Sequence, residues 1–375
     1  NTFTGAVTIT TNDDSDEDGD VTIIAGAGAE LKFAASTIDG DLIATSSHTT
    51  GISDTGALTV AGTASFQTSI TDADILLDVG HAIAGKVTLN TTGTGGDATL
   101  DNGTTALELG TSAASLVTSV GGNLILTSGA AAGITDSATV TVSGNLSATT
   151  DANNGLINLD TLAVAVAAGK TIALATHGTG DATVVNANGI NFAASTIGDD
   201  LIATASDGDV IQSGALTIVG ETTITVATGH DVTLDLASND FNSDDDDNTD
   251  RDVTITGRDV KIRDIDALHL GRQTISGDLT VTAGGNIDDG DILTVDGTTT
   301  ITGGGYVKLN NSGGSDYLGT VNIDAGGEIN LKDQNAIELG IITGTGIFQL
   351  TASLGSTGAV TQKTETGIIT IANPT

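Results

Sequence analysis

The chain has 375 residues, of which 51 are glycine and one is proline, and it contains no cysteine, methionine or tryptophan. Its 48 acidic residues outnumber its 11 basic residues, which gives a net charge of −37. Nucleic-acid binding is therefore not expected, because phosphate contacts need a basic face. Membrane insertion is not expected either, since no segment approaches the ~18–20 consecutive apolar residues that a spanning helix needs. A disulfide framework is excluded by the absence of cysteine.

The expected core is thin. Aromatic residues make up only 2% of the chain, so the interior has to be filled by valine, isoleucine, leucine and alanine. Threonine is abundant, and together with valine and isoleucine it favours β-strands. A thin aliphatic core with many strands is typical of a narrow β-solenoid rather than of a two-sheet sandwich.

The predicted strands are short and are separated by glycine, asparagine or aspartate. Clear examples in chain order are 21–25, 42–45, 124–127, 139–142 and 279–282. The best helix candidate is the segment 162–168, but its apolar residues alternate with period two. We therefore interpret this segment as a strand as well.

One sequence block is repeated along the chain. LKFAASTIDGDLIAT at 31–45 returns almost unchanged as INFAASTIGDDLIAT at 190–204, and looser copies begin at Leu107, Leu268 and Ile337. A period of about 80 residues is too long for one supersecondary unit, so each module should contain several stacked turns. The predicted modules are 1–78, 79–159, 160–238, 239–315 and 316–375, the last of them truncated.

Within a module, landmark motifs recur roughly every 20 residues, the length of one coil of three short strands. The chain is thus predicted to be all-β: a single continuous parallel β-helix over residues 1–375, with about 17–19 coils and the form of an elongated rod. Only the terminal coils of such a stack have open edges, and open strand edges polymerise unless they are covered. The predicted partner is therefore a second copy, stacked head to tail as a homopolymer, or an adjoining segment of the same longer protein.

Residues 239–302 carry the repeat motifs best. These are NDF at 239–241, DALHLG at 266–271, GDLTVTAGGNI at 277–287 and LTVDGTT at 293–299. Their order resembles the repeats of large bacterial adhesins of the filamentous-haemagglutinin type. The resemblance implies a right-handed parallel β-helix, secretion, and a role in adhesion or in a surface fibre.

The expected function is that of an extracellular, non-enzymatic structural protein on a bacterial cell surface, as a subunit of a filament or adhesin fibre. The alternative is a passive stalk segment of a giant secreted adhesin whose binding tip lies outside this chain. Host or environmental glycans remain open as partners. A polysaccharide-active β-helix enzyme is a minor alternative, because such sites use aromatic platforms and grouped cations, whereas this chain has two tyrosines and no tryptophan. Ice or crystal binding through rows of threonine is another, but the T-x-T pairs are irregularly spaced in the sequence.

Two acidic runs are candidate calcium loops. Asp14, Asp16 and Asp18 alternate before Gly19, as in the first half of a D-x-D-x-D-G loop, although Ala25 stands where a bidentate acid is expected. The second run lies in a loop between Phe241 and Val253. The predicted Ca²⁺ ligands are Asp14, Asp16, Asp18, Asp20, Asp244, Asp245, Asp246, Asp247 and Asp250. Plain solvated loops are the alternative for both runs.

No catalytic residue and no organic cofactor site are predicted. The five histidines are scattered without paired ligand spacing, and no Ser-His-Asp arrangement or phosphate loop can be assembled. Each histidine is interpreted as a surface or turn residue: His48, His81, His177, His230 and His269.

Overall fold

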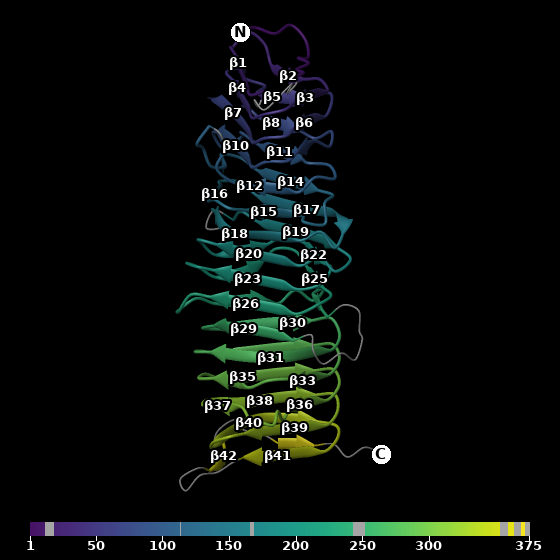
Figure 1. Cartoon of the computed structure of the whole chain (residues 1–375). Coiled ribbons are helices and arrows are strands. Elements are labelled where there is room, and N and C mark those ends of the chain that lie inside the picture. The colour runs from purple at the N-terminus through teal and green to yellow at the C-terminus, as the bar shows by residue number, and fades with distance from the viewer. Residues whose placement is uncertain are drawn as a thin grey trace. The chain divides into compact units, whose positions relative to one another are not determined.

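The computed structural model describes residues 1–11, 19–112, 114–165, 169–242, 252–352, 359–363 and 369–371. Within these ranges the regular structure is β-strand without α-helix, as predicted. The chain forms two compact units: unit 1 comprises residues 1–191 and 196–199, and unit 2 comprises residues 192–195 and 200–375. Figure 1 shows their stacked strands, with unit 1 in purple to teal and unit 2 in green to yellow.

The strands of unit 1 lie on three sides, the third of which has strands in only the first few turns. The first side contains β1 Val21–Ala25, β4 Leu42–Ser46, β7 Ala64–Thr71, β10 Val87–Thr92, β12 Leu107–Leu109, β13 Ser119–Val120, β15 Ile134–Asp136, β16 Val140–Val142, β18 Ile157–Val164 and β20 Ala182–Asn186. The second contains β2 Leu31–Phe33, β5 Ile52–Asp54, β8 Ile75–Leu77, β11 Ala98–Asp101, β14 Leu124–Ser128, β17 Leu146–Asn153 and β19 Ile172–His177. The third contains β3 Ser36–Ile38, β6 Leu58–Val60 and β9 Ala82–Ile83.

Unit 2 repeats this arrangement on two main sides. The first side contains β23 Leu201–Ala205, β26 Thr222–Val226, β29 Val253–Gly257, β31 Leu268–Ile275, β33 Ile287–Asp289, β34 Leu293–Val295, β36 Val307–Leu309, β37 Asp316–Tyr317, β39 Ile329–Asp333 and β41 Phe348–Ala352. The second contains β24 Val210–Gln212, β25 Leu216–Ile218, β27 Val232–Leu234, β28 Asp240–Phe241, β30 Val260–Asp264, β32 Leu279–Ala283, β35 Thr299–Gly303, β38 Thr320–Ala325, β40 Ile337–Gly344, β42 Val360–Gln362 and β43 Ile369–Ile371. The two remaining strands are β21 Ile190–Phe192 and β22 Ser195–Ile197.

All the strand pairings are parallel and join one turn to the next. Val21 of β1 pairs with Leu42 of β4, and Leu42 pairs with Ala64 of β7. A parallel pairing between turns that follow each other along the chain is the defining geometry of a β-solenoid, so the predicted fold class is confirmed. The two units together contain about 15 turns, fewer than the 17–19 that were predicted. The right-handed winding and the five module boundaries stay predictions.

The repeated block folds twice into the same three strands. Residues 31–45 supply β2, β3 and most of β4, and residues 190–204 supply β21, β22 and most of β23. The predicted strands 21–25, 42–45, 124–127 and 279–282 coincide with β1, β4, β14 and β32 to within one residue. The repeat in the sequence is therefore a repeat in the structure.

The core of each unit consists of inward-facing aliphatic columns. Strand β4 has alternating buried and half-buried residues, and the register places Ile23, Ala44 and Phe66 on successive turns of one column. Phe66 packs edge-on against Phe33, with ring centroids 6.4 Å apart at 84°. The thin core that the composition predicts is thus built by stacking, turn upon turn, with few rings.

Glycine allows one turn to approach the next. Gly51 has φ of 79°, and a Cβ at this position would lie 1.9 Å from the carbonyl oxygen of Asp74, one turn further on. Since any side chain would collide with the backbone here, this position requires glycine. Among the described residues there is also no helix with the length and hydropathy that crossing a membrane requires.

We expect Phe66→Ala to lower the free energy of unfolding by about 3–5 kcal/mol, because it removes a fully buried ring and leaves a cavity. Urea denaturation followed by circular dichroism measures this change. The control is Gln67→Ala on the neighbouring, half-buried position of the same strand, for which the loss should stay below about 1 kcal/mol. Equal losses for the two variants would contradict the assigned strand faces.

Candidate functional site

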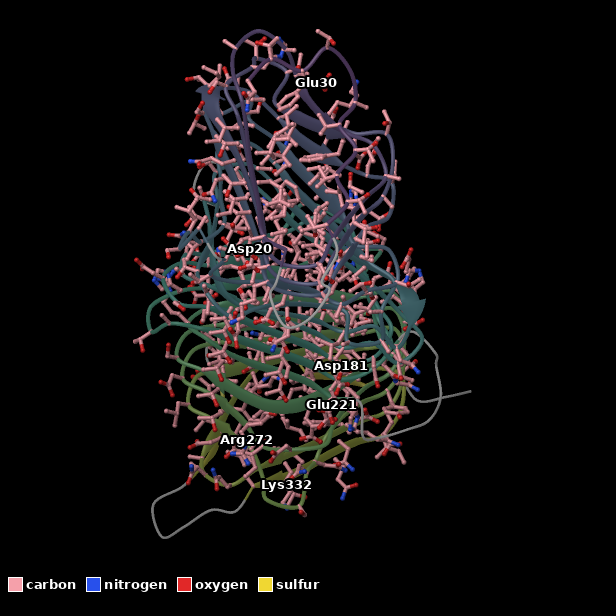
Figure 2. All side chains as sticks on the ribbon, turned by 45° about the horizontal axis from the view of Figure 1, so that its top comes forward. Asp20, Glu30, Asp181, Glu221, Arg272 and Lys332 are labelled. Atoms are coloured by element: carbon pink, nitrogen blue, oxygen red, sulfur yellow. The ribbon has the colours of Figure 1, made fainter. Side chains whose placement is uncertain are left out.

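Aspartates at the corners of the turns bind the backbone of the following turn. Asp20, labelled in Figure 2, accepts the N–H of Asp41 through Oδ1 at 2.8 Å. Asp41 in turn accepts the N–H of Thr63 at 2.6 Å. Each acceptor directly precedes a strand, and the steps are 21 and 22 residues, one turn each. We call such a series a corner ladder.

Longer corner ladders occur in both units. In unit 1 the acceptors are Asp74, Asp97, Asn123 and Asn145, and each binds the next residue of the series, ending at the N–H of Thr171, over 2.6–3.0 Å. In unit 2 they are Asp209, Asp231, Asp259 and Asp278, ending at Thr298, over 2.7–3.1 Å. The short aspartate or asparagine side chain brings an oxygen within reach of an N–H that the strand pairing leaves over. This geometry explains why the acids of this chain are mostly aspartate.

The glycine before a corner acceptor leaves room for it. Gly62 donates its N–H to the carbonyl of Gly40 at 3.0 Å. A Cβ on Gly40, which directly precedes Asp41, would lie 2.4 Å from Oδ1 of Asp20, the corner acceptor of the preceding turn. The recurring sequence Gly-Asp-Leu or Gly-Asn-Leu therefore encodes three contacts: close approach by glycine, the ladder by aspartate or asparagine, and the core by leucine.

A second set of polar side chains is buried inside the units and accepts a backbone N–H of the preceding turn. Asn102 accepts from Ile83 at 2.9 Å, and Asn239 accepts from Leu216 at 3.1 Å. The members of these buried acceptor positions, each at most 1% exposed, are Asn102, Asn186, Asn239, Asp264 and Asp333. They satisfy donors that would otherwise be lost in the core.

Two of the buried acceptors are titratable. Asp264 accepts the N–H groups of Phe241 and Asp266, both at 2.8 Å. Burial nevertheless raises the pKa of Asp264 to about 8, and it also raises the pKa of Asp333. At the other buried acceptor positions, asparagine accepts the backbone N–H without carrying a charge. Asp264 and Asp333 can ionise, so they make the stability of unit 2 dependent on pH.

His81 is a buried neutral histidine. Its Nδ1 accepts the N–H of Leu58 at 2.9 Å, so the proton of the ring is on Nε2, which lies 2.7 Å from Oδ2 of Asp54. Burial lowers the pKa of His81 and raises that of Asp54. The prediction of a surface or turn residue is wrong for this histidine, because its backbone and carboxylate partners lie on another turn.

A charged cluster surrounds His269 in unit 2. The Nδ1 of His269 is bonded to Asp288, its Nε2 lies 3.1 Å from Asp252, and the hydroxyl of Tyr306 donates to Asp288 at 3.2 Å. The ammonium group of Lys308 lies 4.2 Å from the centre of the Tyr306 ring. These five residues, the His269 cluster, come from successive turns and were not brought together by any spacing in the sequence.

The predicted calcium ligands are mostly outside the described residues. This applies to Asp14, Asp16, Asp18, Asp244, Asp245, Asp246, Asp247 and Asp250, for which calcium binding stays a prediction. Asp20 is described, and there it serves as a corner acceptor. Three basic residues of unit 2 pair with aspartates at the surface: Arg258 with Asp231, Lys261 with Asp235, and Arg272, labelled in Figure 2, with Asp291 at 3.0 Å.

Threonines form a regular column on the first side of unit 2. The register aligns Thr225, Thr256, Thr274 and Thr294 on successive turns. The last three line a groove of about 210 Å³ together with Val226, Ile275 and Asp296. The sequence suggested irregular threonine spacing, because the intervals between the aligned threonines are 31, 18 and 20 residues.

We expect Asp97→Ala to destabilise the corner of its turn by about 0.5–1.5 kcal/mol, since the N–H of Asn123 loses its acceptor. Hydrogen exchange at the Asn123 amide measures this loss locally. Asp97→Asn, which keeps the acceptor oxygen and removes only the charge, should leave the exchange rate nearly unchanged. If the asparagine variant exchanges as fast as the alanine variant, charge rather than hydrogen bonding sustains the ladder.

We expect Asp264→Asn to stabilise unit 2 at pH 8 by about 1–3 kcal/mol, although the new amide loses one of the two accepted bonds. Burial raises the pKa of Asp264 in the folded chain. The stability that the protonated carboxyl contributes is therefore fully present below pH 3.8 and is lost as the pH rises through about 8. The gain should therefore vanish toward pH 4. The reciprocal variant Asn239→Asp should lose stability as the pH rises, and urea denaturation at several pH values checks both.

Comparison with known families identifies the repeat. A family model described as repeats of unknown function (DUF5649) matches residues 18–90, 179–244 and 257–324, which together are more than half of the chain. Searches of curated proteins and of solved structures returned no match. The matched ranges contain Gly-Asp corners and buried acceptors of both units, including Asp41, Asn239 and Asp278. The chain belongs to the DUF5649 family of repeats.

Proposed function

We propose that this protein is an extracellular structural β-solenoid, a subunit of a bacterial cell-surface filament or adhesin fibre. The observation that carries this proposal is the continuity of bonding along each unit. Parallel strand pairing, corner ladders and buried acceptors all connect a turn to the next one. A pull along the stack is resisted by several hydrogen bonds per turn acting together, which is what a load-carrying fibre needs.

The surface charge supports the same role. With a net charge of −37, copies of the chain repel one another side by side and stay dispersed. Growth at the two ends of the stack remains possible, because it proceeds by strand pairing. The corner aspartates contribute much of this charge without leaving the backbone unsatisfied. In the proposed role these aspartates keep the protein soluble through their charge and connect successive turns through their hydrogen bonds.

Assembly is proposed to occur by head-to-tail stacking of turns. Residues 1–11 pair with the following turn: the N–H of Val7 donates to Lys32 at 2.8 Å, and the N–H of Ala34 donates to Val7 at 2.9 Å. The opposite edge of this turn is the surface to which we assign the next copy or an adjoining segment of a longer protein. Calcium at the acidic runs 13–20 and 244–250 belongs to the same proposal, as a means to stiffen these loops or to bridge neighbouring rods.

Electron microscopy of the chain, with calcium and after chelation, tests this function. We expect filaments many times longer than one chain, and we expect a variant lacking residues 1–11 to remain as single particles with an unchanged β-type circular dichroism spectrum. The full-length variant Gln67→Ala is the control and should still form filaments. Filaments from the deleted chain would contradict the assigned edge, and single particles under all conditions would favour the passive stalk.

The chelator comparison separates the two roles of calcium. Because backbone stacking needs no cation, filaments that survive chelation would assign the end-to-end contact to strand pairing. Bundles that dissolve into single filaments would assign calcium to lateral bridging. Filaments that fall apart into single chains would place calcium at the end-to-end contact itself.

A further inference from the structure

The His269 imidazole touches two carboxylates through its two different nitrogens. Nδ1 is bonded to Oδ1 of Asp288, and Nε2 lies 3.1 Å from Oδ1 of Asp252. A neutral imidazole has one N–H and one lone pair, so it can donate to only one of these carboxylates while its lone pair faces the other. Only the protonated ring is attracted to both carboxylates, through the hydrogen bond of Nδ1 with Asp288 and through an ion pair of Nε2 with Asp252.

The two carboxylates come from the turns on either side of the histidine. Asp252 directly precedes β29, His269 lies in β31 and Asp288 lies in β33, and these strands pair in that order. We infer that His269 is a pH-dependent clamp, which holds three consecutive turns of unit 2 together while its ring is protonated and loosens them when the proton is lost. This inference concerns the mechanics of unit 2 and does not depend on the proposed assembly.

The surroundings favour the protonated form. The side chain of His269 is only 13% exposed, so its ion pairs are screened less than surface pairs. The backbone of Gly290 covers the ring, since a Cβ there would lie 2.8 Å from Nε2. The hydrogen bond with Asp288, opposed by burial and reinforced by the charges of Asp288, Asp252 and Asp289, raises the pKa of His269.

Other polar and charged groups lie around the clamp. Tyr306 donates its hydroxyl to the second oxygen of Asp288, and Lys308 lies over the Tyr306 ring and 3.9 Å from Glu328. Asp289, next to Asp288, has a pKa that burial raises to about 6, so it adds negative charge near the ring at neutral pH. The net field at His269 is therefore negative.

The direction of the pH effect follows from the raised pKa. A histidine whose folded pKa lies above its ordinary value contributes stability that is complete at low pH and is lost as the pH rises through the folded pKa. Loss of the proton leaves Asp252 and Asp288 on either side of a neutral ring, where one of them faces a lone pair. The turns of β29, β31 and β33 should then separate more easily than their neighbours.

His81 provides an internal reference, because its contacts favour the neutral ring. Its Nδ1 already accepts a backbone N–H, so that nitrogen cannot carry a proton in the folded chain. His269 therefore needs a second proton to pair with both of its carboxylates, whereas His81 excludes one. Both can be followed in the same sample.

The first test is a nitrogen-15 NMR titration of the histidine rings in the full chain. We expect the pKa of His269 to lie above the ordinary 6.5, with both ring nitrogens protonated below it, and His81 to remain neutral with its proton on Nε2. Asp252→Asn and Asp288→Asn should each shift the pKa of His269 downward. A pKa of His269 at or below its ordinary value, or one that neither variant lowers, would overturn the clamp.

The second test measures the mechanical consequence. The amide of Gly290 donates to the carbonyl of Leu270 at 2.9 Å, across the pair of turns that the clamp joins. After correction for intrinsic rates, its protection from hydrogen exchange should fall as the pH passes the pKa of His269, and His269→Gln should remove this pH-dependent loss. An identical pH dependence in the variant would refute the clamp. If His269→Gln does not fold, Asp252→Asn serves for the same comparison.

Discussion

The hydrogen bond between one turn and the next is the interaction on which both units depend. Parallel pairing along the flat sides satisfies most backbone groups, but at the corners the strands end and some N–H groups have no strand opposite them. An unsatisfied donor at every turn would be prohibitively costly for so thin a core. The corner ladders and the buried acceptors meet this requirement, one at the surface and one inside. These two sets of acceptors explain why aspartate and asparagine occupy these positions.

The corner ladders place like charges above one another. In unit 2 the carboxylates of Asp209, Asp231, Asp259 and Asp278 recur at the spacing of the turns, about 4.8 Å. Solvent and salt screen this repulsion, and Arg258 offsets part of it by contacting Asp231 at 2.5 Å and Asp259 at 3.3 Å. In unit 1 the series changes from aspartate to asparagine at Asn123, which keeps the hydrogen bond and omits the charge. The acceptor is therefore the constant requirement, and the charge is an addition.

Much of the fold could be predicted from the sequence because its determinants are local. The alternation of apolar residues predicted the strands, and glycine and aspartate predicted where the strands end. The repeated block predicted that the turns stack. The functional contacts were harder, because their partners lie one turn away. His81 was placed at the surface, yet its partners are 23 and 27 positions earlier in the chain. The His269 cluster depends on the register of turns whose lengths differ, so no fixed spacing between its residues in the sequence predicts it. The signal that could have revealed the corner ladders was present in Gly-Asp-Leu, whose glycine and aspartate were interpreted only as separators between strands.

The buried acceptor positions have a consequence for how such a chain changes over generations. Asparagine and aspartate both fill them, and His81 accepts a backbone N–H in the same way, because what the neighbouring turn requires is a single lone pair in a fixed place. A turn that supplies this lone pair and an aliphatic column fits against any other turn of the same kind. Replacement of one turn by another therefore has a simple structural requirement: the new turn has to supply the lone pair and the aliphatic column at the positions that its neighbours contact.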